Sequence, residues 1–229
     1  MDFVPHSEKQ EEALFSEAPI TVVATGIQWG KTRVGSWFIK RLMHYFPSKD
    51  NAFIVVAPTY KIMEQSSLPA FLEIMQGTGK YNGQRNTFTL FGGGTVYFRT
   101  ATDPDSIVGI TNVRGIWGDE AGKFPRYFWD NIEGRAAFKN CQIIITTSPY
   151  SLNWLFKDVI KPYKMGERDD VNYITASSIE NPYFPREVYE KRKKQMDPRR
   201  HAAMYDGVFE RMQGLVYDCW DDEDNTLHH

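Results

Sequence analysis

An apolar strand pattern, a glycine loop and a helical pattern follow one another at residues 19–46, and this order constrains the fold more than any other feature. The β-branched run at residues 19–24 predicts a buried strand. The loop behind it ends in Gly30-Lys31-Thr32. In a phosphate-binding loop Gly30 lets the backbone approach a phosphate, Lys31 places its charge against the β- and γ-phosphates, and Thr32 offers a hydroxyl to Mg²⁺. The segment therefore predicts a nucleotide-triphosphate site.

One part of this loop departs from the usual pattern. Thr25 stands where a phosphate loop normally has its first glycine, and Gly26 comes one place late. A chance Gly-Lys-Thr in an ordinary loop is the alternative, and the correct flanking elements favour the phosphate site over it. The candidate nucleotide-contacting residues of the loop are Thr25, Gly26, Ile27, Gln28, Trp29, Gly30, Lys31 and Thr32.

The composition predicts a folded, soluble protein. Of 229 residues, 41% are hydrophobic and 14% aromatic, which is enough for a sizeable core. The net charge of −2 does not indicate a nucleic-acid binder, so contact with DNA would need a local basic patch or a ring of subunits. Two cysteines, Cys141 and Cys219, favour a reducing, intracellular compartment. We expect no signal peptide and no membrane span.

Further apolar runs alternate with helical patterns. Strands are expected at residues 52–57, 116–118, 142–147 and 171–175, and a hairpin is expected to join residues 87–90 to 95–99. Helices are expected at residues 7–16, 31–46, 60–75, 125–138, 152–160, 185–195 and 198–205, with Pro69 kinking or splitting the third.

Strands that are apolar throughout and alternate with helices predict an α/β fold, here a three-layer P-loop NTPase core with a mostly parallel sheet. After about residue 178 the strands stop and polar helices begin. We therefore expect the core at residues 1–178, a small helical lid or linker subdomain at 179–215, and a further linker at 216–229.

Hydrolysis of a bound nucleotide needs a second, acidic element, which Asp119-Glu120 can supply after the apolar run at 116–118. There Asp119 would hold Mg²⁺ and Glu120 would polarise the attacking water, at the sheet edge where α/β folds bind ligands. The alternative is a solvated pair that caps the next helix. Taken with Lys31, the hydrolytic roles are favoured: Glu120 and Lys31 are the catalytic candidates, and Thr32 and Asp119 are the metal ligands.

The next strand ends in Thr146-Thr147-Ser148-Pro149. Hydroxyls at such a strand end can sense the γ-phosphate and pass its loss to the following segment. Simple turn chemistry, to which Ser-Pro is well suited, is the alternative. The position favours Thr146 and Thr147 as coupling residues.

Taken together, these motifs resemble the ATPase domain of large terminase subunits, the motors that package DNA into the procapsids of tailed bacteriophages. The resemblance covers nearly the whole chain, through short and degenerate motifs. The segments that carry it are Gly26–Thr32, Val55–Tyr60, Arg99–Ala101 with Asp105–Gly109, Asp119–Ala121, Thr146–Pro149 and Tyr205–Glu210.

The resemblance implies an ATPase that uses ATP and Mg²⁺ to drive double-stranded DNA into a procapsid. It further implies a portal protein and a small terminase subunit as partners and a homo-oligomeric ring, a pentamer in the family. The expected location is the host cytoplasm, docked on the procapsid. Gln10 is similar to the glutamine with which the family contacts adenine, and a surface glutamine is the alternative.

The family often carries an arginine within the phosphate loop, and Ile27 stands at that position. The missing charge must then come from elsewhere. Arg85, Arg99 and Arg114 are candidates for an arginine finger supplied by a neighbouring subunit, although for each of them taken singly a structural or surface role is favoured. Such a finger can raise turnover by ~10³–10⁵.

Full-length family members continue into a nuclease domain. The acidic run at residues 218–224 has no predicted sheet to fix metal-ligand geometry, so we expect a linker there and no nuclease activity. DNA contact is possible at Lys157, Lys161 and Lys164 and at the basic run 191–194, and a solvated helix face is the alternative.

Three other functions are compatible with a nucleotide-binding core. The first is a helicase-like translocase acting outside packaging, and the second is a regulatory module that binds nucleotide without turnover. The third is a small-molecule kinase, for which the sequence offers no acceptor-site signature.

Overall fold

The computed structural model describes residues 4–137 and 140–210. Eight strands form one sheet in the order β3-β4-β5-β2-β6-β7-β1-β8. They are β1 Ile20–Thr25, β2 Ala52–Ala57, β3 Gly79–Asn82, β4 Thr87–Leu90, β5 Thr95–Thr100, β6 Val113–Asp119, β7 Gln142–Thr147 and β8 Val171–Ala176. The strands from β5 to β8 in this order pair in parallel, whereas β3 and β4 pair antiparallel at one edge.

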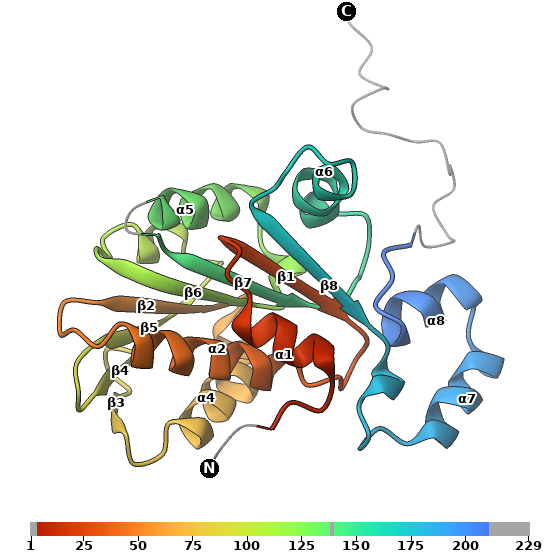
Figure 1. The fold of residues 1–229 in the computed structure, drawn as a ribbon, viewed down its shortest axis with the longest axis horizontal. Helices are drawn as coiled ribbons and strands as arrows, with labels where there is room; N and C mark the ends of the chain where they lie inside the picture. Colours follow the sequence, from red (N-terminus) through yellow and green to blue (C-terminus); the bar gives the residue numbers. More distant parts are fainter. Residues whose placement is uncertain (1–3, 138–139, 211–229) are drawn as a thin grey trace, which may run out of the picture.

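Helices cover both faces of the sheet (Figure 1). One face carries α1 Glu8–Phe15, α2 Lys31–Tyr45 and α4 Leu68–Ile74, and the other carries α5 Arg126–Ala136 and α6 Lys161–Lys164. The connecting helical segments are α3 Tyr60–Ile62, η1 Met63–Ser67, η2 Pro104–Ile107, η3 Ala121–Lys123, η4 Leu155–Ile160 and η5 Ser178–Glu180.

The three layers arise because successive side chains of a buried strand point to opposite faces of the sheet, and both faces are covered by helices. In β2, Val55 packs into the core beneath α2, whereas Ile54 and Val56 pack into the core beneath α5. Each face of a central parallel strand therefore needs its own apolar side chains. This arrangement confirms the three-layer α/β fold with a mostly parallel sheet.

Two polar helices, α7 Arg186–Gln195 and α8 Pro198–Tyr205, lie beyond β8 (Figure 1). They enclose a small apolar cluster of Phe184, Tyr189 and Tyr205. They follow the last strand of the sheet. The expected domain boundaries remain predictions, and residues 211–229, including the acidic run and Cys219, lie outside the described residues.

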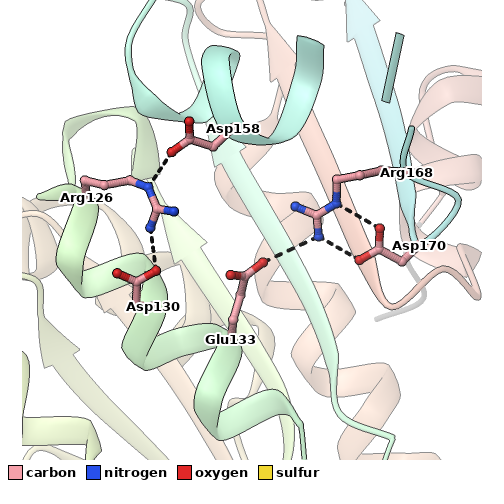
Figure 2. Close-up of polar contacts among 6 residues, drawn as sticks. All are labelled: Arg126, Asp130, Glu133, Asp158, Arg168 and Asp170. Atoms are coloured by element: carbon pink, nitrogen blue, oxygen red, sulfur yellow. Dashed lines mark hydrogen bonds and ion pairs between the residues drawn. The ribbon is translucent and has the colours of Figure 1, made fainter. Parts of the chain in front are cut away.

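Ion pairs fasten α5 to the segments that follow β7 (Figure 2). The guanidinium of Arg126 contacts Asp130 on its own helix and Asp158 in η4. Arg168 contacts Glu133 of α5 at 3.4 Å and Asp170, just before β8, at 2.7 Å. These pairs are partly exposed, so each contributes only about 0–1 kcal/mol to stability. Their effect is to fix how α5 sits against its neighbours.

The structure differs from the sequence-based expectations in several places. The expected helix at 60–75 is one helical run, α3-η1-α4, whose middle turn η1 is π-helical, and this irregularity directly precedes Leu68-Pro69, as expected for a proline inside a helix. The expected helix at 152–160 begins only at Leu155 and is also π-helical. Strand β3 was not predicted, because Gly79–Asn82 is polar and lies at an edge.

Two glycines inside helices give a matched test of this packing. A Cβ at Gly35 of α2 would lie 2.2 Å from the Trp117 ring of β6, whereas a Cβ at Gly134 of α5 would meet nothing within 4 Å. We expect Gly35→Ala to lower the free energy of unfolding by about 1–3 kcal/mol through overpacking. Gly134→Ala should raise it by about 0.5–1 kcal/mol, because alanine favours helix. Urea denaturation measures both, and a stabilising Gly35→Ala would contradict the close α2–β6 contact.

Candidate active site

The loop between β1 and α2 has the backbone of an anion cradle. Gln28 and Gly30 adopt left-handed conformations, with φ of 57° and 106°. Such alternation turns successive amides toward one concave side, and the positive end of the α2 dipole begins at Lys31. Thr32 lies half-buried in the first turn of this helix. The local chemistry therefore suits a phosphate group.

Lys31 is buried within the loop. Its Nζ donates to the carbonyl oxygens of Thr25 at 3.2 Å and Gly26 at 3.0 Å. Burial lowers the pKa of Lys31, and the nearby charges of Glu120 and Asp119 oppose that shift. A lysine cation is thus held among carbonyls and two carboxylates.

Asp119, at the end of β6, is also buried, with 1% of its surface exposed. Its Oδ2 accepts a hydrogen bond from Ser67 Oγ at 2.8 Å, and its Oδ1 accepts one from Thr146 Oγ1 at 2.8 Å. Trp117 Nε1 in turn donates to Thr146 Oγ1 at 2.9 Å. Burial raises the pKa of Asp119, while these two hydroxyls and the charge of Lys31 act in the opposite direction.

Glu120 has a different setting from its neighbour. Its backbone is left-handed, with φ of 53°, a conformation that costs about 1–3 kcal/mol in a residue other than glycine and is frequent at functional sites. The hydroxyl of Tyr150 donates to Glu120 Oε2. Burial first, and the Glu120 charge second, raise the pKa of the Tyr150 hydroxyl above its ordinary value.

Gln10 touches the loop from the helix α1. Its Nε2 donates to the Trp29 carbonyl oxygen at 2.9 Å, and its Oε1 accepts from the His6 amide at 2.8 Å. A pocket of about 450 Å³ opens beside it, lined by Val4, His6, Gln10, Gly30, Arg33, Asn181 and Tyr183. The pocket places aromatic and amide groups next to the cradle, which suits a base. The adenine contact of Gln10 itself remains a prediction.

The segment from η5 to α8 also contacts the loop between β1 and α2. Ile27 N donates to the Met204 carbonyl oxygen at 2.9 Å, and Ser178 Oγ donates to the Ile27 carbonyl oxygen at 2.7 Å. A Cβ at Gly26 would lie 2.1 Å from the Tyr205 carbonyl oxygen, so this close approach requires glycine. The Ile27 side chain packs on the apolar cluster of the C-terminal helices. Contact with these helices gives Ile27 a structural role.

The structure separates the three candidate arginines. Arg99 is held by its own chain, donating to the carbonyl oxygens of Phe98 at 2.8 Å and Ser106 at 3.2 Å. Arg114 lies at the amino-terminal end of β6, opposite the loop edge of the sheet, with its guanidinium 5.1 Å from the centre of the Phe46 ring. Arg85 is exposed in the turn before β4.

The sequence-predicted residues Lys31, Asp119, Glu120 and Thr146 come together at one edge of the sheet. Thr147 lies beside them, where its Oγ1 accepts from the Gly122 amide at 3.3 Å. Trp29 is different, because its side chain is 1% exposed and belongs to the core. Sequence reasoning missed three residues that act through partners far along the chain: Ser67, Tyr150 and Asn181. Asn181 Nδ2 donates to the Gln28 carbonyl oxygen of the loop at 2.6 Å. A serine pair before Pro69 and a tyrosine directly after Pro149 carry no signal of their own.

Fold and loop together define the chain as an α/β protein with a P-loop NTPase core. A family model described as phage terminase large subunit matches residues 60–208, which is more than half of the chain. The protein belongs to the phage terminase large subunit family. The matched residues include Asp119, Glu120 and Thr146 but not the loop itself. No curated protein sequence matches the chain.

Solved structures share this fold. The large terminase of a thermophilic bacteriophage superposes with a TM-score of 0.79 at 18% identity, covering 96% of this chain and 57% of that one. The same terminase in complex with ATP-gamma-S gives 0.77 at 18% identity, covering 95% and 56%. The ATPase domain of the Thermus phage P74-26 large terminase gives 0.72 at 19% identity, covering 91% and 95%. The chain thus spans a little over half the length of the first of these terminases.

Neither a membrane helix nor a clustered metal site is found in the described part of the chain. No helix in residues 4–137 and 140–210 is long and apolar enough to cross a membrane. Within the same ranges no group of three or more histidine, cysteine, aspartate or glutamate side chains is placed to hold a metal ion.

Ser67 and Ser66 test the anchoring of Asp119. Ser67→Ala removes a buried donor at 2.8 Å, and we expect the free energy of unfolding to fall by about 1–3 kcal/mol. Ser66 Oγ lies 3.5 Å from the same oxygen and is half-buried, so Ser66→Ala should change it by less than about 0.5 kcal/mol. Urea denaturation of nucleotide-free protein measures both. Equal losses in the two variants would contradict the assignment of Ser67 as the main donor.

Proposed function

We propose that this chain is the ATP-hydrolysing motor domain of a phage large terminase, which drives double-stranded viral DNA into a procapsid. One observation carries the proposal: the buried Lys31 of the phosphate loop lies near two carboxylates at the end of β6, the buried Asp119 and the half-buried Glu120. A loop that only bound nucleotide would have no need of this acidic pair. The structures of a related terminase with ADP and with ATP-gamma-S support ATP as the ligand.

In this mechanism the loop amides and Lys31 bind the β- and γ-phosphates. Thr32 and Asp119 would hold Mg²⁺, and they fit it because they offer hard oxygen ligands and because the buried Asp119 carboxylate, with the Glu120 charge near it, is offset by two hydroxyl donors and Lys31. The bound cation would neutralise charge that develops on the phosphates. Glu120 orients and polarises the attacking water.

The proposed coupling runs through the end of β7. Thr146 holds Asp119, and Thr147 holds the segment after Glu120. A change in the phosphates would therefore reach β7 through groups already bonded to it. From there it would pass to the C-terminal helices, which we take to be the lid, and to DNA.

The wider setting follows from the family and from a likeness to the Phi-28 gp11 DNA packaging motor, at a TM-score of 0.51. We propose a homo-oligomeric ring, pentameric by family resemblance, that works with a portal protein and a small terminase subunit. Its location would be the host cytoplasm, on the procapsid. The absence of nuclease activity stays an expectation from the sequence.

Arg85 is the best placed of the three arginines to serve a neighbouring subunit. Its side chain is exposed and makes no hydrogen bond or ion pair within the described part of the chain. Arg99 is held by backbone carbonyls, and Arg114 packs at the opposite sheet edge. With Ile27 in the loop, an isolated subunit should turn over slowly and an assembled ring faster.

The turn between α7 and α8 is the best candidate for DNA contact. Residues 191–200 carry six exposed cations and one aspartate, Asp197. The cations in the last turn of α7 stabilise that helix, because they lie at the negative end of its dipole. Arg199 and Arg200 lie instead at the positive end of the α8 dipole, where a cation is unfavourable. Helix stability therefore does not account for Arg199 and Arg200, and we propose that this turn binds DNA phosphates.

Phosphate release from ATP tests the proposed chemistry. We expect Lys31→Ala to reduce kcat by roughly 10²–10³, through loss of phosphate stabilisation. Glu120→Gln should reduce it by roughly 10²–10⁴ while leaving ATP affinity nearly unchanged.

In rings, Arg85→Ala should abolish the acceleration that assembly gives, whereas Arg114→Ala should not. ATP binding without phosphate release from assembled wild type would indicate a regulatory module, and transfer to an acceptor would indicate a kinase.

The salt dependence of DNA binding tests the basic turn. For the double variant Arg199→Ala, Arg200→Ala, we expect the slope of log K against log salt to shrink by about 2, because each lost phosphate contact removes ~0.9. Lys161→Ala, an exposed lysine of α6, is the matched control and should leave the slope unchanged. Fluorescence anisotropy of a labelled duplex measures both. A slope altered only by Lys161→Ala would place the DNA contact on α6. In a separate assay, unwinding of a DNA duplex by the wild-type protein would favour a helicase-like translocase.

A further inference from the structure

Tyr150 follows the end of β7 and reaches back to the acidic pair on β6. Its hydroxyl donates a hydrogen bond to Glu120 Oε2. The ring is held from its other side, where Lys123 Nζ lies 4.5 Å from the ring centre. The tyrosine is therefore fixed at both its ring and its hydroxyl.

The backbone around this contact is tied together as well. Asn153 Nδ2 donates to the Gly122 carbonyl oxygen at 2.6 Å, and Trp154 Nε1 donates to the Phe124 carbonyl oxygen at 2.8 Å. Thr147 accepts from the Gly122 amide. Three bonds therefore join the segment after Glu120 to the end of β7 and to the segment behind it.

The Tyr150 contact uses only one side of the Glu120 carboxylate. A carboxylate has two oxygens and about four acceptor positions. Within residues 4–137 and 140–210 the Glu120 side chain makes no other hydrogen bond or ion pair. Its Oε1 thus remains available to accept from water, while Oε2 sets the orientation of the group.

We propose that Tyr150 is a positioning residue for hydrolysis, whose hydroxyl holds the Glu120 carboxylate by one oxygen so that the other can orient the attacking water. This inference rests on the proposed ATPase function. It adds a group that acts through Glu120, and it links the orientation of that carboxylate to the end of β7. A carboxylate free to rotate would spend less time in the productive geometry.

Tyr150→Phe removes the hydroxyl and keeps the ring over Lys123, so folding should be retained. We expect kcat to fall about 10-fold, as for other groups that orient an active-site side chain. The KM for ATP and the affinity for a fluorescent ATP analogue should stay within about twofold, because the phosphate loop is untouched. Tyr127→Phe, which alters an exposed tyrosine of α5, is the control and should leave kcat unchanged.

A double-mutant cycle with Glu120→Gln separates positioning from a general structural effect. If Tyr150 acts through Glu120, Tyr150→Phe should produce no further loss of kcat in the Glu120→Gln background. Urea unfolding of nucleotide-free wild type, Tyr150→Phe, Glu120→Ala and their double variant gives a readout without activity, and because alanine removes the acceptor of the Tyr150 hydroxyl, the two substitutions should be non-additive there. An unchanged kcat in Tyr150→Phe, an equal loss in both backgrounds, or additive unfolding would overturn the proposal.

Phosphate release by the wild-type protein separates the role of Tyr150 from the ATPase function itself. A wild-type protein that releases no phosphate, alone or assembled, refutes the ATPase function, and hydrolytic positioning falls with it. An active wild type with an equally active Tyr150→Phe variant refutes only the role of Tyr150.

Discussion

A buried carboxylate, Asp119, governs how this site is built. Taking an ion out of water costs several kcal/mol unless partners replace the lost hydration. The partners come from three separate segments: Ser67 from η1, Thr146 from β7 and Lys31 from the loop. Because each must reach the end of β6, that one charge fixes how these segments meet. The π-helical turn η1 ends at Ser67, the residue that binds the carboxylate.

The loop is held from two sides, and this accounts for its unusual composition. Gln10 binds it from α1, and the backbone of Met204 and Tyr205 approaches it from α8. Glycine is needed at position 26 because no Cβ fits there, and an apolar residue is favoured at 27 because it packs on the C-terminal helices. A charged side chain at 27 would leave that cluster. In the proposed mechanism, the contact of Ile27 with the C-terminal helices therefore leaves the loop without a cation at position 27 for the phosphates.

The strands and motifs that could be predicted from the sequence are those marked by a short, contiguous residue pattern. Apolar runs at residues 20–25, 52–57 and 142–147 mark buried strands, and the Gly-Lys-Thr and Asp-Glu motifs each follow a strand. The sequence did not reveal Ser67 and Tyr150, because what defines them is a partner 52 or 30 residues away. It also could not show that Arg99 is occupied by backbone carbonyls. Pairing across the sheet depends on register, which no short motif encodes.

Asp119 and Glu120 are neighbours in sequence, yet the fold places their carboxylates in different environments. Asp119 is the last residue of β6 and keeps its carboxylate buried between strands. The left-handed backbone at Glu120 turns the next side chain out of that setting and toward Tyr150. Two like charges that shared one environment would raise each other's proton affinity. In the proposed mechanism, this single left-handed residue would let Asp119 hold the cation while Glu120 faces the attacking water.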